Sequence, residues 1–157
     1  MILALALTLA TSSAPVTKII PEHRYEAKLV RALDGDTISV LVTARATTRL
    51  PGRDLELSTS SLETVRLAGV NAPESKGKCE AERKLAQEAK LYVEGRLRGE
   101  TFEIVTRGQE SEKFGRTLAD IEVGGLSLSQ ELIRRGLADP YHGEKRDPDR
   151  WCGGGGR

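Results

Sequence analysis

The sequence contains only two cysteines, Cys79 and Cys152, among its 157 residues. They do not form a Cys-x-x-Cys pair, so nothing in the sequence indicates a zinc site. Histidine is equally scarce, and we interpret His23 and His142, which stand apart from each other, as surface residues. The sequence has no internal repeat, no heptad pattern and no apolar run of about 20 residues, so it predicts no solenoid, coiled coil or membrane-spanning helix.

An excess of charge of either sign is also missing, since 24 Lys and Arg side chains stand against 23 Asp and Glu. A protein that coats nucleic acid through its overall charge neutralises many phosphates. The near balance argues against that class, but it leaves room for an enzyme that contacts a few phosphates locally. A chain of this length with 38% hydrophobic residues can bury one core, and we predict a single domain.

The first charged side chain is Lys18. Before it, Ile2–Ala10 is apolar and is followed by small residues, a pattern typical of a secretory signal and its cleavage region. The run is too short to span a bilayer, which takes about 20 residues. We predict that residues 1–14 are a signal peptide or apolar leader and that the protein is secreted or periplasmic. The alternative is a buried N-terminal strand.

Export would place the two cysteines in an oxidising compartment. One disulfide between Cys79 and Cys152 would then tie the C-terminal tail to the body of the protein, whereas the alternative is two free thiols. We favour the disulfide if the chain is exported.

Alternation and helical spacing of apolar residues predict five strands and two helices. The predicted strands are Tyr25–Leu33, Asp36–Ala44, Thr64–Val70, Glu100–Arg107 and Arg116–Gly124. The first predicted helix lies within Gly77–Gly99, and its apolar face carries Ala81, Leu85, Ala89, Tyr92 or Val93, and Leu97. The second lies within Ser127–Ala138, with Ser127 as N-cap and Gln130 as its capping-box partner.

Two connections in this pattern carry specific predictions. Asp34-Gly35 is a turn signal, because glycine takes a positive φ without steric penalty. The segment Arg45–Glu63 is polar and weakly patterned, with Pro51-Gly52 in its middle, and we predict a long, exposed and mobile loop.

The predicted fold class is α+β, mainly β. Its element order is three strands, a long helix, two strands and a short helix, which suits a five-stranded OB-fold barrel. We expect this domain to cover residues 22–142, followed by a charged, Gly-rich tail at 143–157 that is disordered at its end.

Four short motifs carry candidate chemistry: "DGDT" at Asp34–Thr37, Arg66 in "VRLAGV", "NAPE" at Asn71–Glu74, and "KFGR" at Lys113–Arg116. Each alone has an ordinary structural interpretation as a turn, a solvated strand residue or a strand start. Together and in this order they resemble the staphylococcal nuclease (thermonuclease) family. The likeness extends from Tyr25 to Tyr141 and includes the closing "ELIRRGLADPY".

The resemblance implies a nuclease built on an OB barrel. By it, Arg66 and Arg116 bind the scissile phosphate and Glu74 is the general base. The residue types suit these roles, since a guanidinium stays charged and presents a fork to phosphate oxygens, while a carboxylate can accept a proton from water. Tyr141 is either a base-stacking residue or a packing residue of the late helix.

The resemblance also implies a calcium site. Asp36 resembles a ligating aspartate, and the backbone carbonyl of Thr37 resembles another ligand. Asn71 stands where the best-known family member has an aspartate. Its amide oxygen can still bind a hard cation, but it brings no negative charge, so we expect weak Ca²⁺ binding.

The sequence therefore leads to a metal-dependent nuclease of low sequence specificity. Its expected substrates are DNA and RNA, preferably single-stranded, and the products would carry 3′-phosphate ends if it follows the family. The main alternative is a non-catalytic OB-fold module that binds nucleic acid or protein, and a weaker one is a structural envelope protein. We expect a monomer.

Overall fold

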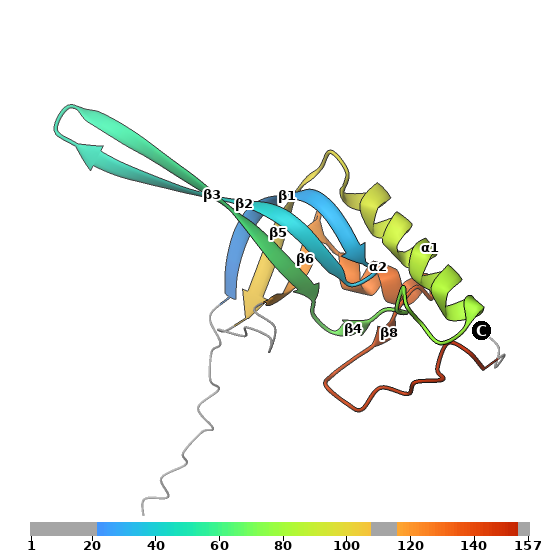
Figure 1. Cartoon of the computed structure of the whole chain (residues 1–157). Coiled ribbons are helices and arrows are strands. Elements are labelled where there is room, and N and C mark those ends of the chain that lie inside the picture. The colour runs from blue at the N-terminus through green and yellow to red at the C-terminus, as the bar shows by residue number, and fades with distance from the viewer. Residues whose placement is uncertain (1–21, 108–115, 154–157) are drawn as a thin grey trace, which may run out of the picture.

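The computed structural model describes residues 22–107 and 116–153 (Figure 1). The predicted leader at residues 1–14, the segment Gly108–Gly115 and the last four residues lie outside these ranges. Within the described ranges, no helix combines the length and the apolar character that crossing a bilayer requires.

Five strands form the body of the protein, and they close into a ring. The strands are β1 (Glu22–Asp34), β2 (Thr37–Leu50), β3 (Arg53–Leu67), β5 (Thr101–Arg107) and β6 (Thr117–Val123). Antiparallel pairs join β3 to β2, β2 to β1, β1 to β5 and β5 to β6, and a parallel pairing of β3 with β6 completes the circuit. The five-stranded OB-type barrel that the sequence predicts is confirmed.

Short elements surround the ring. They are β4 (Val70–Asn71), α1 (Glu80–Leu97), β7 (Leu126–Ser127), α2 (Leu128–Arg134) and β8 (Asp139–Pro140). β4 pairs with β8, and β7 pairs with β6. Figure 1 shows α1 and α2 on the same side of the barrel. The barrel interior is filled by inward-facing aliphatic residues, of which Ile38, Val40 and Ile121 have no exposed surface.

Both predicted helices are present. The buried side of α1 carries Ala86, Ala89, Val93 and Leu97, a spacing of three and four residues that places them on one face. The prediction that Ala81 lies on this face is wrong, because Ala81 is exposed and the neighbouring Glu82 is buried instead. α2 begins as predicted, with Oγ of Ser127 accepting a hydrogen bond from the Gln130 backbone N–H at 3.3 Å.

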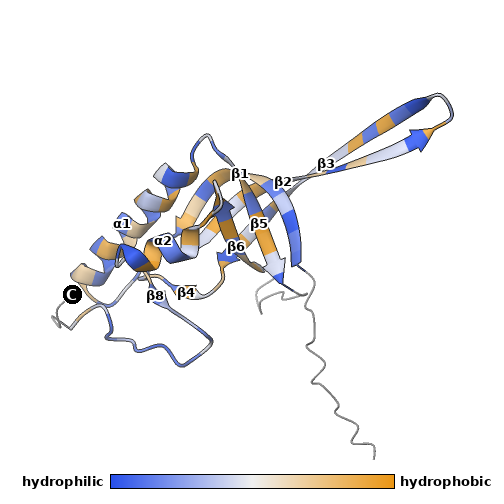
Figure 2. Cartoon of the chain, turned by 180° about the vertical axis from the view of Figure 1, so that it is seen from behind, coloured by the Kyte–Doolittle hydropathy of each residue, from blue (hydrophilic) through white to orange (hydrophobic). Residues whose placement is uncertain are grey.

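The prediction that Arg45–Glu63 forms a loop is wrong, although the segment is exposed as expected. This segment forms the outer halves of β2 and β3, which pair without a break from Leu50 opposite Arg53 to Thr37 opposite Arg66. Figure 1 shows the hairpin as an arm that projects from the barrel, away from α1. Most of its side chains are exposed on both faces, and hydrophobic residues are scattered among hydrophilic ones along it without a sustained period (Figure 2). A strand with no buried face lacks the alternation that identifies strands in a sequence.

The β1–β2 hairpin turns at Gly35-Asp36, where the sequence predicts a reversal. Gly35 does not use a positive φ for this turn, since it is not among the positive-φ glycines of the described residues. Glycine is needed there for space, because a Cβ would lie 2.7 Å from Cβ of Ala89 and 2.9 Å from Cβ of Ala72. The missing side chain therefore lets the hairpin, helix α1 and the chain after β4 meet.

Candidate active site

Asp36 is the centre of the candidate site. It lies in the β1–β2 turn and is only 7% exposed. Its Oδ2 accepts a hydrogen bond from the Ala72 backbone N–H at 2.7 Å, and its Oδ1 accepts one from Oγ1 of Thr37 at 3.2 Å. The first bond joins the "DGDT" turn to the "NAPE" segment, which lie far apart in the sequence.

Arg66 lies beneath the same two segments. It is 3% exposed on β3, and its guanidinium forms an ion pair with the Asp36 carboxylate. It also donates from Nη1 to the Asp36 carbonyl at 3.4 Å and from Nη2 to the Val70 carbonyl at 3.3 Å. The predicted phosphate clamp and the predicted metal ligand are therefore in direct contact. Burying either charge alone would be costly, and the pairing offsets that cost.

Arg116 comes to the same region through the parallel pairing of β6 with β3. Thr117 pairs with Val65, and Leu118 pairs with Arg66. Arg116 directly precedes β6 and stands two residues before Leu118. Because side chains two residues apart in an extended chain share a face, we expect Arg116 on the face that carries Arg66. Lys113 and Phe114, the other members of its motif, lie outside the described residues.

The predicted metal ligands offer oxygen atoms only. Oδ1 of Asn71 is buried and has no hydrogen-bond partner in the described structure, and Asn71 is the neighbour of Ala72, which binds Asp36. Thr37 follows Asp36 directly and is 8% exposed. A carboxylate, an amide oxygen without a donor and a nearby carbonyl suit a hard cation such as Ca²⁺. The set carries one negative charge, on Asp36, and that carboxylate also forms the ion pair with Arg66.

A second group of potential ligands does not form a metal site. Cys79, Glu82 and Cys152 bring their ligand atoms within 4.8 Å of one another, and no other such group of three Asp, Glu, His or Cys residues occurs in the described ranges. The two sulfurs are joined as a disulfide, so they have no thiolate to offer.

Glu74 ends the "NAPE" segment with its side chain 54% exposed, directly after the buried Pro73. Its carbonyl accepts a hydrogen bond from the Gly77 N–H at 2.8 Å, which forms a tight turn. Its carboxylate forms an ion pair with Arg146, with Nη1 and Oε1 2.6 Å apart. The carboxylate is therefore open to solvent on one side and contacts the C-terminal tail on the other.

Glu82 fixes the backbone that carries Glu74, and sequence analysis missed it. From the first turn of α1, its Oε1 accepts from the Glu74 N–H at 3.4 Å and its Oε2 from the Lys78 N–H at 2.9 Å. Glu82 stands three residues after Cys79, the N-cap of α1. From this position a glutamate side chain can accept hydrogen bonds from backbone N–H groups at the start of the helix. The signal was hidden because cysteine is not one of the usual capping residues.

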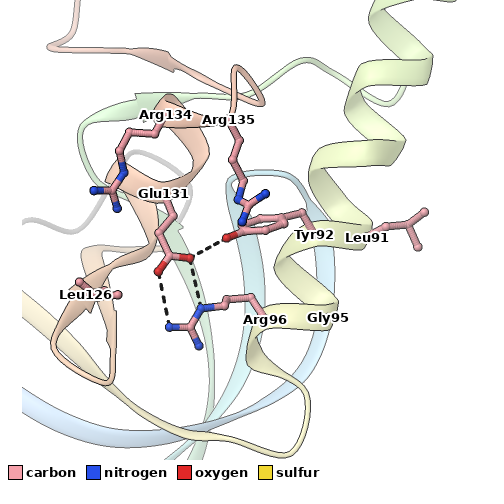
Figure 3. Close-up of a pocket in the computed structure, with 8 residues that line it drawn as sticks. All are labelled: Leu91, Tyr92, Gly95, Arg96, Leu126, Glu131, Arg134 and Arg135. Carbon is pink, nitrogen blue, oxygen red and sulfur yellow. Dashed lines mark hydrogen bonds and ion pairs between the residues drawn. The ribbon is translucent and has the colours of Figure 1, made fainter.

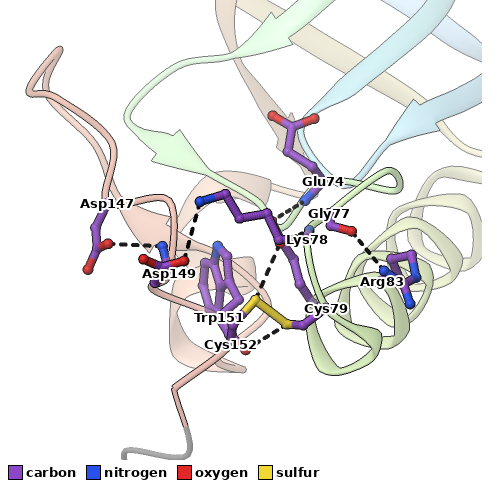
Figure 4. The surroundings of a disulfide bond; sticks show 10 residues. Glu74, Gly77, Lys78, Cys79, Arg83, Asp147, Asp149, Trp151 and Cys152 are labelled. Atoms are coloured by element: carbon purple, nitrogen blue, oxygen red, sulfur yellow. Dashed lines mark hydrogen bonds and ion pairs between the residues drawn. A yellow bond between two sulfur atoms is a disulfide. The ribbon is translucent and has the colours of Figure 1, made fainter.

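The tail is joined to the body by the predicted disulfide, Cys79–Cys152 (Figure 4). Around it, Nζ of Lys78 lies 3.3 Å from the Asp149 carboxylate, and the Arg150 guanidinium stacks on Trp151 with 5.0 Å to the ring centroid. Arg150 also makes two hydrogen bonds to Asp139, and these raise its pKa. The tail is thus held by contacts as far as Gly153, and the predicted disorder at its end concerns residues that are not described.

A groove of about 820 Å³ lies elsewhere, between α1 and α2 (Figure 3). None of the predicted site residues lines it. Glu131 in it accepts hydrogen bonds from Tyr92 at 2.7 Å and from Arg96 at 3.1 Å. Burial acts to raise the pKa of Glu131, but these two donors outweigh it and leave that pKa lowered. Because these charges satisfy one another, we interpret the groove as a helix–helix junction and not as the reactive site.

Comparison with known proteins identifies the family of the chain. The sequence model of the family described as staphylococcal nuclease homologue matches residues 64–150, more than half of the chain. This chain belongs to the staphylococcal nuclease family. The match includes Arg66, Asn71, Glu74 and Arg116, and it runs through Arg146 into the tail.

The curated relatives of this member of the staphylococcal nuclease family match it at 24–29% identity. The chain is 29% identical over 128 residues to Endonuclease YncB of Bacillus subtilis (strain 168), covering 75% of this chain and 51% of that protein. It is 24% identical over 139 residues to Thermonuclease of Staphylococcus hyicus, covering 87% of this chain and 73% of that one. Endonuclease Htp3 of Saprolegnia parasitica (strain CBS 223.65) is 28% identical over 125 residues, 76% of this chain and 57% of that protein. The chain spans about half the length of several curated relatives that it matches.

Proposed function

We propose that this chain is a metal-dependent nuclease that hydrolyses phosphodiester bonds of DNA and RNA with little sequence preference. The observation that carries the proposal is the Asp36 carboxylate, which contacts Arg66 and the Ala72 N–H and so joins three of the four motifs. Membership of a family whose relatives are named endonuclease and thermonuclease supports the same reaction class.

In the proposed reaction, each side chain has a distinct role. Arg66 and Arg116 stabilise the charge that grows on the phosphate oxygens as a nucleophile approaches. Glu74 accepts a proton from the attacking water, and Pro73 limits the directions in which its carboxylate points. Asp36, Asn71 and the Thr37 carbonyl would hold Ca²⁺, which would add positive charge beside the phosphate. We expect 3′-phosphate products and a preference for single strands.

Low sequence preference follows from the groups available. Contacts to the phosphate backbone position a nucleic acid but carry no sequence information, whereas base edges specify. The proposed clamps are guanidinium groups aimed at phosphate. We also propose that the protein is exported, since an oxidising compartment is where a structural disulfide such as Cys79–Cys152 persists.

Cleavage of a labelled single-stranded oligonucleotide tests the proposal directly. We expect cleavage with Ca²⁺, none with excess chelator, and recovery when Ca²⁺ is restored. Arg116→Ala should lower kcat/KM by about 100-fold or more, the typical cost of removing a charge-stabilising group. Arg49→Ala is the matched control, because Arg49 is an exposed arginine paired with Asp54 on the arm. Binding without cleavage would favour the non-catalytic module, and cleavage that survives both the chelator and Arg116→Ala would overturn the proposal.

The amide at position 71 gives a separate prediction for the metal. Asn71→Asp adds a negative charge to a ligand set that has only one, so we expect Ca²⁺ to bind about 10-fold more tightly. Isothermal calorimetry on both proteins without substrate measures this. Equal or weaker binding by the Asn71→Asp variant would contradict the assignment of the site, whatever the activity.

A further inference from the structure

The tail segment from Tyr141 to Cys152 is fixed at both ends beside Glu74. At its start, the Tyr141 N–H donates to the Gly69 carbonyl at 2.9 Å, next to the pairing of β8 with β4. At its end, Cys152 is bonded to Cys79 at the start of α1. The segment therefore spans the same stretch of chain, from β4 to α1, that carries Asn71 and Glu74.

Between these two anchors, Arg146 lies against the proposed general base. Its Nη1 is 2.6 Å from Oε1 of Glu74, and its guanidinium lies over the Tyr141 ring, 5.7 Å from the centroid. The side chains of Arg146 and Glu74 are 41% and 54% exposed. Exposed ion pairs contribute little to stability, so holding the fold is a weak explanation for a guanidinium at this place.

We propose that Arg146 is a third phosphate-binding guanidinium of the site. It pairs with Glu74 when no nucleic acid is bound, and it binds a backbone phosphate next to the scissile one in the complex. This inference rests on the proposed function, because it takes Glu74 as the base. Arg146 occupies one oxygen of the Glu74 carboxylate, Oε1, and a move of its guanidinium to a phosphate frees that oxygen for water.

The substrate itself supplies the competing partner. A phosphodiester carries a full negative charge, and arginine matches its oxygens with two parallel N–H groups. Because Arg146 is half exposed and its segment is anchored on either side, the guanidinium can exchange one anion for another without large movement of the backbone. The ring of Tyr141 keeps it close to the site through a cation–π contact.

Salt dependence of binding separates this role from a structural one. A phosphate contact on single-stranded nucleic acid contributes about 0.7 to the slope of log affinity against log salt concentration, and a residue that only holds the tail contributes nothing. Binding is measured by fluorescence anisotropy with a labelled single-stranded oligonucleotide, Ca²⁺ present, in the Glu74→Gln background, where cleavage does not interfere. Three further substitutions are compared in this background. They are Arg146→Ala, Arg146→Lys and Lys145→Ala, and the last is the matched control because Lys145 is an exposed cation of the same segment.

We expect Arg146→Ala to reduce the slope by about 0.7. Arg146→Lys should keep the slope, because it keeps the charge, and Lys145→Ala should leave it unchanged. With Glu74 intact, Arg146→Ala should raise KM for the oligonucleotide by about 10-fold and change kcat by less than about 3-fold, as expected for a contact made equally before and during the reaction.

The outcomes distinguish this inference from the function it rests on. An unchanged slope in Arg146→Ala overturns the role of Arg146, even if the protein with Glu74 intact cleaves DNA. A reduced slope in a protein that never cleaves supports the phosphate contact and overturns the nuclease. A fall in kcat with KM unchanged would also overturn the inference, since it would assign Arg146 to the chemistry of the base.

Discussion

Replacing Glu74 by glutamine is expected to lower kcat by about 10²- to 10⁴-fold, the range typical of losing a positioned acid–base group. Glutamine keeps the shape of the side chain and its hydrogen-bonding oxygen, but the amide cannot accept the proton of the attacking water. The fold should be unaffected, because the carboxylate is 54% exposed and the Glu82 contact uses the backbone N–H of this residue. Steady-state kinetics on a single-stranded oligonucleotide with saturating Ca²⁺ measures the effect.

The control for this experiment is Glu56→Gln. Glu56 is an exposed glutamate in the outer half of β3, opposite Thr47, so its substitution makes the same chemical change on the arm. We expect its kcat to match that of the unmodified protein within about 2-fold, since surface substitutions rarely matter. If Glu74→Gln keeps its kcat within about 10-fold, Glu74 is not the base, and the acid that activates water must be sought elsewhere in the site.

Local patterns were sufficient to predict most of the regular structure. β1 and β2 alternate because one side faces the barrel interior, and α1 repeats every three to four residues because one side packs on the barrel. The cap at Ser127 is a local hydrogen bond that needs only the next three residues. The projecting arm could not be predicted in this way, because neither of its faces is buried and its residues are free of the constraint that creates a pattern.

For the candidate site, the sequence was sufficient to predict the motif residues but not the contacts between them. The motifs around Asp36, Arg66 and Glu74 are short and ordered in the sequence, so a family likeness found them. The contacts of Asp36 depend on the antiparallel register of β2 and β3 and on the close approach at Gly35. The place of Arg116 depends on the parallel register of β3 and β6, and no short window of sequence encodes these long-range pairings. Arg146 is 72 residues from Glu74 and lies in a polar tail, where one arginine is indistinguishable from its charged neighbours.

The contact between Asp36 and Arg66 has a consequence for how this site is organised. A buried carboxylate can orient a guanidinium, as Asp36 does for Arg66, and in the proposed site the same group would also hold the cation. The Arg66 guanidinium and Ca²⁺ would then share the single negative charge of Asp36, because Asn71 adds no negative charge. A bound phosphate, being anionic, relieves this imbalance, so we expect Ca²⁺ and substrate to strengthen each other's binding.

Removing the disulfide should give the largest loss of stability. The bond joins residues 73 apart, and closing a loop of that length restricts the unfolded chain by about 4 kcal/mol in the chain-entropy model. We expect the double variant Cys79→Ser, Cys152→Ser to unfold with a free energy lower by about this amount, measured by urea titration. Because the bond also anchors the tail that carries Arg146, KM for the oligonucleotide should rise while kcat changes little.

Reduction of the unmodified protein is the matched comparison for the double variant. Dithiothreitol should lower the stability of the unmodified protein to that of the double variant and should not change the stability of the double variant. This comparison separates the loss of the disulfide bond from the loss of packing by the sulfur atoms. The barrel should survive in both cases, since its strands pair with one another and the tail contributes none of them. If the double variant and the oxidised protein unfold at the same urea concentration, the covalent link does not stabilise the fold. If KM for the oligonucleotide is unchanged in the double variant, the tail contacts of Lys78 and Arg150 are sufficient to hold Arg146 beside Glu74.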